Sequence, residues 1–436
     1  LLAPGDISAI ASWLAGRAPG EDRAPLPARS LRPPVRCGSI ESPDVPRAPA
    51  PPPASRGEYL VTAASCRSCH TVPGGAPFAG GRAIPTPFGT IYSTNLTPDA
   101  RTGIGRWSKE DFRRAVREGI APDGSYLYPA FPFTHYTKVR DDDVDAMFDY
   151  LRSLSPVAHE NRAPEMRFPY DKRPLLAGWR ALYFRKGEFR EDPKRSAGWN
   201  RGAYLVQALG HCSACHSTRN AWGAITAEPR VGGGLIPMLN WYAPSLTASR
   251  ETGLGDWRHE DIESLLATGV SPRGAVFGPM AEVVRDSLQR LTREDIAAIA
   301  EYLKAQREEG GRRADERVDE RQLAPLLAAG KRIYGDRCAD CHGDDGRGKA
   351  GAYPPLADNE SILMANPVNA IRMTLNGGFP PSTSGNPRPY GMPPFAHVLS
   401  DDDAAAVVTY IRRSWGNAAG PVSAVAVSAA RGVPLE

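Results

Sequence analysis

Three short segments of the chain each carry two cysteines and a histidine in the pattern Cys-x-x-Cys-His. They are Cys66, Cys69 and His70; Cys212, Cys215 and His216; and Cys338, Cys341 and His342. This spacing is the attachment signature of a c-type haem, whose vinyl groups form thioethers with the two thiols while the adjacent histidine binds the iron. A zinc site would need a second nearby pair of cysteines or histidines, and a thioredoxin-like pair does not explain the histidine. The motifs therefore predict three covalently bound haems c.

The size and composition of the chain limit the class of protein. Its 436 residues suggest about three domains. The 42 prolines and 43 glycines suit loop-rich domains in which a haem supplies much of the core. A formal net charge of +4 without a run of Lys or Arg gives no case for nucleic-acid binding.

Haem attachment of this type takes place outside the cytoplasmic membrane, which bears on the location of the protein. We therefore expect a periplasmic protein, although no secretion signal is visible in this chain. No apolar run is long enough to span a bilayer. We expect association with the outer face of the cytoplasmic membrane through a partner or a surface segment.

The sequence around the motifs is an internal repeat. Arg56–Val61, Arg201–Val206 and, in looser form, Ala329–Tyr334 precede the three motifs. Each segment reads as a short amphipathic helix that runs into its haem motif. Thr102–Trp107 recurs as Thr252–Trp257, and the pattern predicts that a helix follows each copy.

Each repeat also closes with an acidic cap followed by an apolar helical face. The predicted closing helices span 141–154, 292–305 and 400–415, and a polar cap with clustered Asp favours a helix N-terminus. Two terminal helices that cross over a haem are the arrangement of class I cytochrome c domains, which these repeats resemble. We therefore expect a mainly α protein with three tandem, loop-rich domains of this type, each built around one covalent haem.

The predicted organisation consists of three modules and the segments between them. Module one spans residues 56–159, module two 200–308 and module three 323–420. The other segments are a possible remnant helix of an upstream module (1–16), a Pro-rich linker (17–55), an aromatic connector (160–199), a charged linker (309–322) and a C-terminal tail (421–436).

The second axial ligand of each iron has a large influence on its redox potential, and Met raises this potential relative to a second His. Met280 and Met392 hold the same place in modules two and three, each beside a proline in a Gly-containing loop shortly before the closing helix. A methionine is often only a core filler, but the shared position favours ligation of iron.

Module one departs from this pattern, because Phe131 occupies the matching stretch and the methionines Met147 and Met166 lie in or beyond the closing helix. His135 is the nearest side chain that could bind iron, so haem one is predicted to have two histidine ligands. A five-coordinate iron with Phe131 shielding its open face is the alternative. His135 could also be a hydrogen-bonded loop histidine.

The three modules, together with Leu127–Ala130 and Ser414–Asn417, resemble the triheme cytochrome c subunits of bacterial membrane-bound dehydrogenases. That family serves alcohol, gluconate, sorbitol and fructose dehydrogenases, and some molybdenum hydroxylases that oxidise aldehydes or N-heterocycles. Phe131–Tyr136, Asn161–Pro164 and Arg173–Trp179 look more like the cytochromes that accompany molybdenum hydroxylases.

The resemblance implies an electron-transfer subunit that has no catalytic residues of its own. Its expected partners are a catalytic dehydrogenase subunit and, on the acceptor side, membrane quinone or a terminal oxidase. A molybdenum hydroxylase is the favoured catalytic partner, with a flavoprotein or quinoprotein as alternatives, and a small iron–sulfur subunit could also belong to the complex. The rival hypotheses are a peroxidase-like haem enzyme with an open iron at haem one, a free periplasmic electron carrier and a haem-based sensor.

Overall fold

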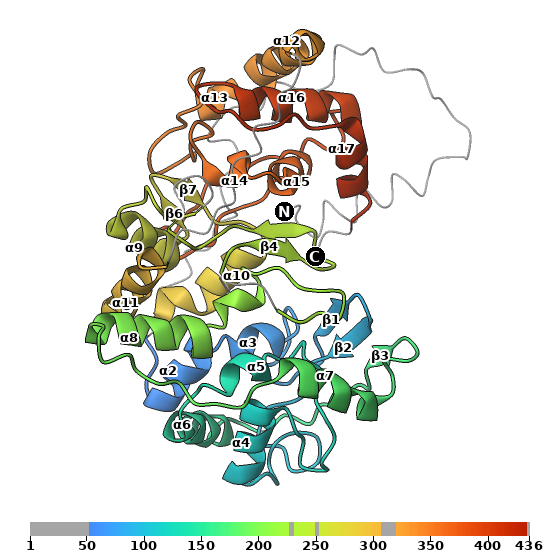
Figure 1. Cartoon of the computed structure of the whole chain (residues 1–436), viewed down its shortest axis with the longest axis vertical. Helices are drawn as coiled ribbons and strands as arrows, with labels where there is room; N and C mark the ends of the chain where they lie inside the picture. The colour runs from blue at the N-terminus through green and yellow to red at the C-terminus, as the bar shows by residue number, and fades with distance from the viewer. Residues whose placement is uncertain (1–51, 226–230, 249–252, 307–319, 434–436) are drawn as a thin grey trace, which may run out of the picture.

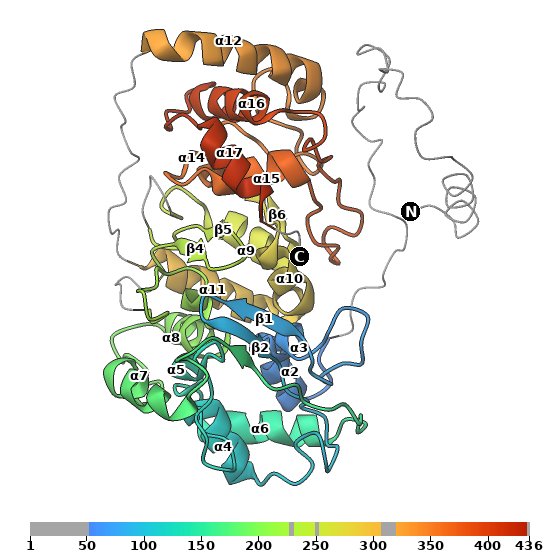
Figure 2. The same ribbon diagram turned by 90° about the vertical axis from the view of Figure 1, so that its right-hand side faces the viewer.

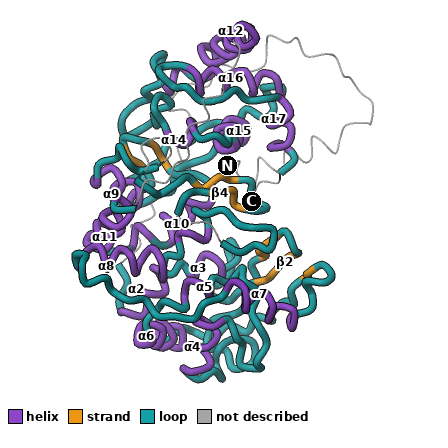
Figure 3. The backbone as a smooth tube through the Cα atoms, viewed as in Figure 1, coloured by secondary structure: helices purple, strands orange, loops and turns teal. Residues whose placement is uncertain are grey.

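The computed structural model describes residues 52–225, 231–248, 253–306 and 320–433. The predicted remnant helix, nearly all of the Pro-rich linker and most of the charged linker lie outside these residues. Figure 1 shows the three modules stacked along the long axis of the molecule, with module two between the other two. Helices connected by long loops make up most of the described chain (Figure 3).

The helices fall into four groups, one for each module and one for the connector. Module one contains α2 (Arg56–Ala63), α3 (Cys66–Cys69), α4 (Lys109–Glu118), α5 (Phe133–Tyr136) and α6 (Asp141–Arg152). Module two contains α8 (Ala197–Tyr204), the single turns η2 (Leu205–Leu209) and η3 (Cys212–Ala214), α9 (His259–Thr268), α10 (Pro279–Asp286), η4 (Leu288–Arg290) and α11 (Arg293–Lys304). Module three contains α12 (Glu320–Arg337), α13 (Ala339–His342), α14 (Glu360–Leu363), α15 (Val368–Asn376), α16 (Asp401–Arg413) and α17 (Ala424–Arg431), and the connector contains η1 (Arg173–Leu175) and α7 (Leu176–Tyr183).

In each module the helix before the haem motif crosses the closing helix, as α12 and α16 do at one end of the molecule (Figure 2). A glycine lies at each crossing, and a Cβ there would collide with a backbone carbonyl oxygen of the closing helix. The pairs are Gly57 with Ala146, Gly202 with Ala298, and Gly330 with Ala406. The repeated glycine therefore allows the two backbones to approach closely.

The predicted helix starts are confirmed where a polar residue caps the chain. Ser108 and Ser400 form capping boxes with the third residues of α4 and α16, and Thr292 accepts a hydrogen bond at the start of α11. Asp and Glu in the first turns also interact favourably with the helix dipole. These local signals account for the agreement between the predicted and observed closing helices.

The described residues contain three small antiparallel sheets between the helices. The strands are β1 (Ala83–Thr86), β2 (Gly89–Tyr92) and β3 (Glu165–Met166) in one sheet, β4 (Gly234–Ile236) and β5 (Trp241–Ala243) in the second, and β6 (Val270–Ser271) and β7 (Gly274–Ala275) in the third. β1 pairs with β2 so that Ile84 faces Ile91, and β3 from the connector joins the free edge of β2 through Met166 and Gly89. The connector is thereby tied to module one.

Modules one and two share one hydrophobic core. Leu60 and Met147 from module one belong to the same cluster of buried side chains as Leu205 and Ile299 from module two. Module three has a separate core, in which α12, α15 and α16 pack together. The first two modules therefore form one packing unit.

Two buried carboxylates join modules one and two in a reciprocal manner. Asp295 of α11 binds Arg201 of its own module through two hydrogen bonds, of 2.8 and 2.6 Å, and accepts a 2.5 Å hydrogen bond from the hydroxyl of Tyr59 in module one. The Tyr59 oxygen in turn accepts a hydrogen bond from the backbone N–H of Thr292, at 3.2 Å.

The same arrangement occurs with the modules exchanged. Asp143 of α6 binds Arg56 of module one at 2.7 Å and accepts a 2.6 Å hydrogen bond from the hydroxyl of Tyr204 in module two. The Tyr204 oxygen accepts from the backbone N–H of Arg140, at 3.2 Å. Both copies of the Arg-Gly-x-Tyr sequence thus bind the closing helix of their own module with the arginine and that of the neighbour with the tyrosine.

Module three meets module two through polar contacts of another kind. Asn369 of α15 makes two hydrogen bonds with the backbone of Tyr242, of 2.9 and 2.8 Å. The indole N–H of Trp257 donates to Glu360 at 2.9 Å. Burial raises the pKa of the Glu360 carboxyl to about 7.

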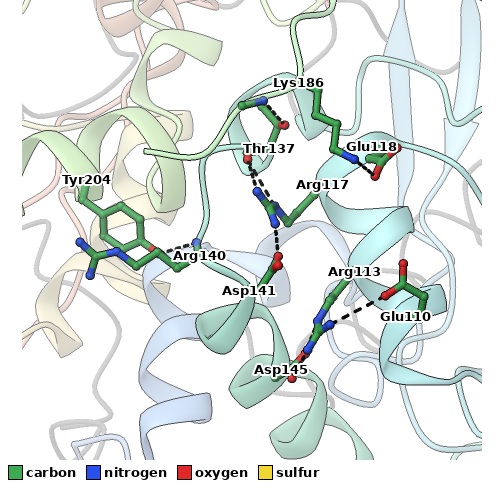
Figure 4. A network of polar contacts seen from close by, with 11 residues as sticks. Glu110, Arg113, Arg117, Glu118, Thr137, Arg140, Asp141, Asp145, Lys186 and Tyr204 are labelled. Atoms are coloured by element: carbon green, nitrogen blue, oxygen red, sulfur yellow. Dashed lines mark hydrogen bonds and ion pairs between the residues drawn. The ribbon is translucent and has the colours of Figure 1, made fainter. Parts of the chain in front are cut away.

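The connector helps to hold the end of α5 against the neighbouring helices α4 and α6 of module one (Figure 4). Arg117 of α4 pairs with Asp141 and donates to the carbonyl oxygen of Thr137 at 3.1 Å. The Thr137 hydroxyl accepts from the backbone N–H of Gly187 at 3.2 Å, and Lys186 pairs with Glu118 at 2.6 Å. The end of α5 is therefore held from α4, α6 and the connector at once.

Residues 421–436 were expected to form a tail, but the described part of this segment is packed against module three. The side chains of Val427 and Ala430 on α17 are buried in the core of module three. Arg431 pairs with Asp401 at the start of α16, at 2.5 Å. Small apolar side chains on one face of α17 explain this packing. Within the described ranges, no helix has the length and apolar character needed to cross a membrane.

Candidate haem site

One cavity of about 2130 Å³ runs through the molecule and is lined by residues of all three Cys-x-x-Cys-His motifs. Its walls come from the motif segments, the small sheets, the loops before the closing helices and the apolar faces of those helices. A single cavity reaches from Cys66 in module one to His342 in module three. The three motifs therefore face a common interior.

Each motif forms one tight turn that places both sulfurs and the imidazole close together. The backbone N–H of the motif histidine donates to the carbonyl oxygen of the first cysteine in every copy. These bonds join His70 to Cys66 at 3.0 Å, His216 to Cys212 at 2.9 Å and His342 to Cys338 at 3.0 Å. This local geometry suits two thioethers and one axial nitrogen on the same haem.

The three motif histidines are held in the same way. Nδ1 of each ring bonds a backbone carbonyl oxygen: Thr94 for His70 at 2.6 Å, Pro244 for His216 at 2.7 Å and Pro354 for His342 at 3.1 Å. Because a carbonyl oxygen only accepts, Nδ1 must carry the proton, which leaves the Nε2 lone pair for iron. Burial lowers the pKa of all three rings, so they are neutral ligands at neutral pH.

The thiols are neutral in this enclosed setting. Burial raises the pKa of Cys66, Cys212 and Cys338 to about 12. Burial also raises the pKa of Cys69, and the nearby thiol of Cys215 adds to this shift.

Cys341 differs from the other motif cysteines of the described chain, because it is disulfide-bonded. A sulfur atom in a disulfide cannot also form a thioether. Attachment of haem three through both Cys338 and Cys341 therefore requires that this disulfide is absent from the haem-loaded protein.

The two predicted methionine ligands line the cavity. Met280 lies in the first turn of α10, two residues after Gly278, whose φ of 55° turns the chain into the helix. Met392 is held by two backbone hydrogen bonds with Gly378, of 2.8 and 3.0 Å. The helix α10 and the bonded loop of Met392 each fix the backbone of their methionine, which suits a side chain that must stay at one place in the cavity.

The structure does not place His135 among the residues that line the cavity. The short helix α5 turns its ring toward module two, where Nε2 bonds the hydroxyl of Ser213 at 2.8 Å, while Nδ1 lies 3.2 Å from the hydroxyl of Thr134. Phe131 lines the cavity instead. This hydrogen bond joins modules one and two, and ligation of haem one by His135 remains a prediction.

Three features near the site were not predicted. The reciprocal Arg-Gly-x-Tyr contacts could have been suspected from the repeated tyrosines, but their crossing between modules had no sequence signal. Arg82 on the first hairpin pairs with Glu282, two residues after Met280, with one contact at 3.0 Å. The ring of His211 packs edge-on against Tyr136, with ring centroids 5.5 Å apart.

Comparison with known proteins supports this interpretation of the cavity. The Cytochrome c family model matches residues 54–155, 200–307 and 327–415, one segment for each motif. The chain is 39% identical to the cytochrome c subunit of alcohol dehydrogenase (quinone) of Gluconobacter oxydans over 85% of this chain and 80% of that protein. It is also 39% identical to the gluconate 2-dehydrogenase cytochrome c subunit of Pantoea cypripedii, over 84% of this chain and 86% of that protein.

A third relative is longer than this chain. It is a subunit of the nicotinate dehydrogenase of Pseudomonas putida, which is 43% identical over 83% of this chain, but the match spans only 30% of that protein. The family matches and the three motifs together mean that the chain carries three covalent haem c groups. When bound, each iron can cycle between its ferrous and ferric states. The chain belongs to the cytochrome c family.

Proposed function

We propose that this protein is the electron-transfer subunit of a periplasmic, membrane-associated dehydrogenase complex. It accepts electrons from a catalytic subunit, passes them through its haems and delivers them to membrane quinone or a terminal oxidase. The observation that carries this proposal is the single cavity lined by all three haem motifs. Haems that share one cavity are not separated by an intervening protein domain. This arrangement favours electron transfer from one haem to the next.

The contacts between the modules support a fixed relay rather than three independent carriers. Modules one and two share a core and two buried carboxylates, and module three is hydrogen-bonded to module two through Asn369 and Glu360. The ion pair of Arg82 and Glu282 joins module one to α10 of module two. Such contacts would keep the distances between haems constant during turnover.

The identity of the catalytic partner is the finer part of the proposal. The curated relatives with similar sequences are named as subunits of nicotinate, alcohol and gluconate dehydrogenases. The identity of 43% to the nicotinate dehydrogenase protein supports a molybdenum hydroxylase that oxidises an N-heterocycle or an aldehyde. A small iron–sulfur protein that passes electrons from that enzyme to the haems is then expected.

The proposal is tested on the native complex. The protein is purified from membranes under mild conditions, its companions are identified by mass spectrometry, and the preparation is analysed for molybdenum, flavin and quinone cofactor. Nicotinate, ethanol and gluconate are then added separately without oxygen, and haem reduction is followed by stopped-flow absorbance.

We expect one substrate class to reduce all the haems, and a quinone analogue to reoxidise them. Reduction by nicotinate together with a molybdenum subunit would support the finer proposal, and reduction by an alcohol or gluconate would replace it with another dehydrogenase. A protein that purifies without a companion and is reduced by none of the substrates would contradict the electron-transfer subunit.

A further inference from the structure

We propose that the haem of module one is five-coordinate and binds a small neutral diatomic ligand, such as carbon monoxide or nitric oxide, on its distal face. The inference goes beyond electron transfer and does not depend on which dehydrogenase is the partner. It concerns only the side chains that surround the first motif.

The internal repeat supplies the first argument. In modules two and three a methionine lines the cavity before the closing helix, namely Met280 at the start of α10 and Met392 in a loop. In module one the matching loop presents Phe131 to the cavity. A phenyl ring has no lone pair to donate to iron, so the position that supplies a sulfur in the other modules supplies none here.

The polar side chains near Phe131 form hydrogen bonds with other groups of the protein. His135 bonds the hydroxyl of Ser213 at 2.8 Å and does not line the cavity. The hydroxyl of Tyr136 donates to the carbonyl oxygen of Ala64 at 2.9 Å, and that of Tyr128 to the carbonyl oxygen of Tyr170 at 2.9 Å. Both hydroxyl groups are therefore engaged with backbone carbonyl oxygens.

Three other potential ligands touch the cavity near module one, and each is accounted for by other contacts. Met147 lies inside α6 at the position that Ile299 and Val407 hold in α11 and α16, where it packs in the core. Met166 belongs to β3, which is paired with Gly89 of the hairpin. The ring of His211 packs edge-on against the rings of Tyr136 and His135, with centroids 5.5 and 6.3 Å away.

The side chains around Phe131 determine which kind of small molecule can bind to the iron. The ring of Phe131 packs against that of Tyr136, with centroids 5.6 Å apart, and Ala130 and Pro132 flank it. Polarity and hydrogen-bond donors on the distal side decide whether a haem activates oxygen species or merely binds a ligand. We expect the apolar side chains of this segment to favour a neutral diatomic molecule over a ligand that needs an acid–base group.

The experiment uses the full-length protein with its haems attached. The ferrous protein is titrated with carbon monoxide and followed by difference absorbance, and the ferric protein is examined by electron paramagnetic resonance. We expect saturation at one carbon monoxide per protein and a high-spin ferric signal from one haem. The variant Phe131→Met should lose both features, whereas Phe88→Met, which adds a methionine elsewhere on the cavity wall, should keep them.

Other outcomes would overturn the proposal. If the wild-type protein binds no carbon monoxide and its ferric haems are all low-spin, a side chain such as Met166 or His211 completes haem one. Rapid turnover of hydrogen peroxide by the wild-type protein would refute the neutral-ligand part. Because the titration of the wild-type protein decides the matter by itself, the test stands even if Phe131→Met fails to fold.

Discussion

The reciprocal tyrosines predict a defined loss of stability when one hydroxyl is removed. Tyr59→Phe deletes the hydrogen bond to Asp295, a residue that is only 8% exposed. A hydrogen bond to a charged group contributes about 1.5–3 kcal/mol. Because every 1.4 kcal/mol is about a factor of ten in an equilibrium constant, amide-exchange protection that depends on this interface should fall roughly 10- to 150-fold.

Hydrogen–deuterium exchange of the haem-loaded protein, read by mass spectrometry, measures this loss for each helix. Peptides from α2, α8 and α11 should lose protection, while those from α16 should not, because module three has a separate core. Tyr204→Phe should behave in the same way through Asp143. The control Tyr334→Phe removes a neutral bond to the carbonyl of Gly343 and should affect module three alone, by about 0.5–1.5 kcal/mol. Equal loss of protection in all three modules, or none in α8 and α11, would refute the reasoning.

Three further predictions concern the axial ligands, a helix crossing and a buried carboxylate. Met280→Ala and Met392→Ala should each lower the potential of one haem, within the range of about 0.8 V that axial ligands span; spectroelectrochemical titration that shows no shift would remove that methionine from the ligand set. Gly202→Ala should lower the free energy of unfolding in urea by roughly 1–3 kcal/mol, because its Cβ would collide with the α11 backbone; an unchanged midpoint would contradict the close crossing. Burial raises the pKa of Asp295, but hydrogen bonds from Arg201 and Tyr59 outweigh it and leave the pKa below its ordinary value. The stability that this carboxylate contributes should therefore be complete above about pH 4 and lost as the pH falls further, and urea midpoints measured against pH should show this loss for wild type but not for Asp295→Asn.

The parts of the structure that could be predicted from the sequence are those with local signals. The geometry of a haem motif is local, because one helical turn brings Cys66, Cys69 and His70 together. The closing helices begin at polar caps such as Ser400, and their apolar faces follow helical spacing. The positions of Met280 and Met392 could be predicted because the chain repeats itself.

The parts that could not be predicted depend on contacts between distant segments. The direction of the His135 ring is set by the α5 turn and by Ser213, which is 78 residues away in the chain. The pairing of Tyr59 with Asp295 spans 236 residues. The α17 helix is too short for its pattern to distinguish a packed helix from a tail, and only the apolar surface of module three determines its place.

The common cavity has a consequence for the order of biosynthesis. A thioether forms from a reactive thiol, yet Cys66 and Cys212 are only partly exposed on the cavity wall, and burial raises their pKa to about 12. We therefore expect the attachment machinery to reach these cysteines while the segments are still apart. The attached haems would then form part of the surface on which the modules pack together. Haem attachment should therefore precede docking of the modules. A chain that misses one attachment should fail to bring its modules together around the common cavity.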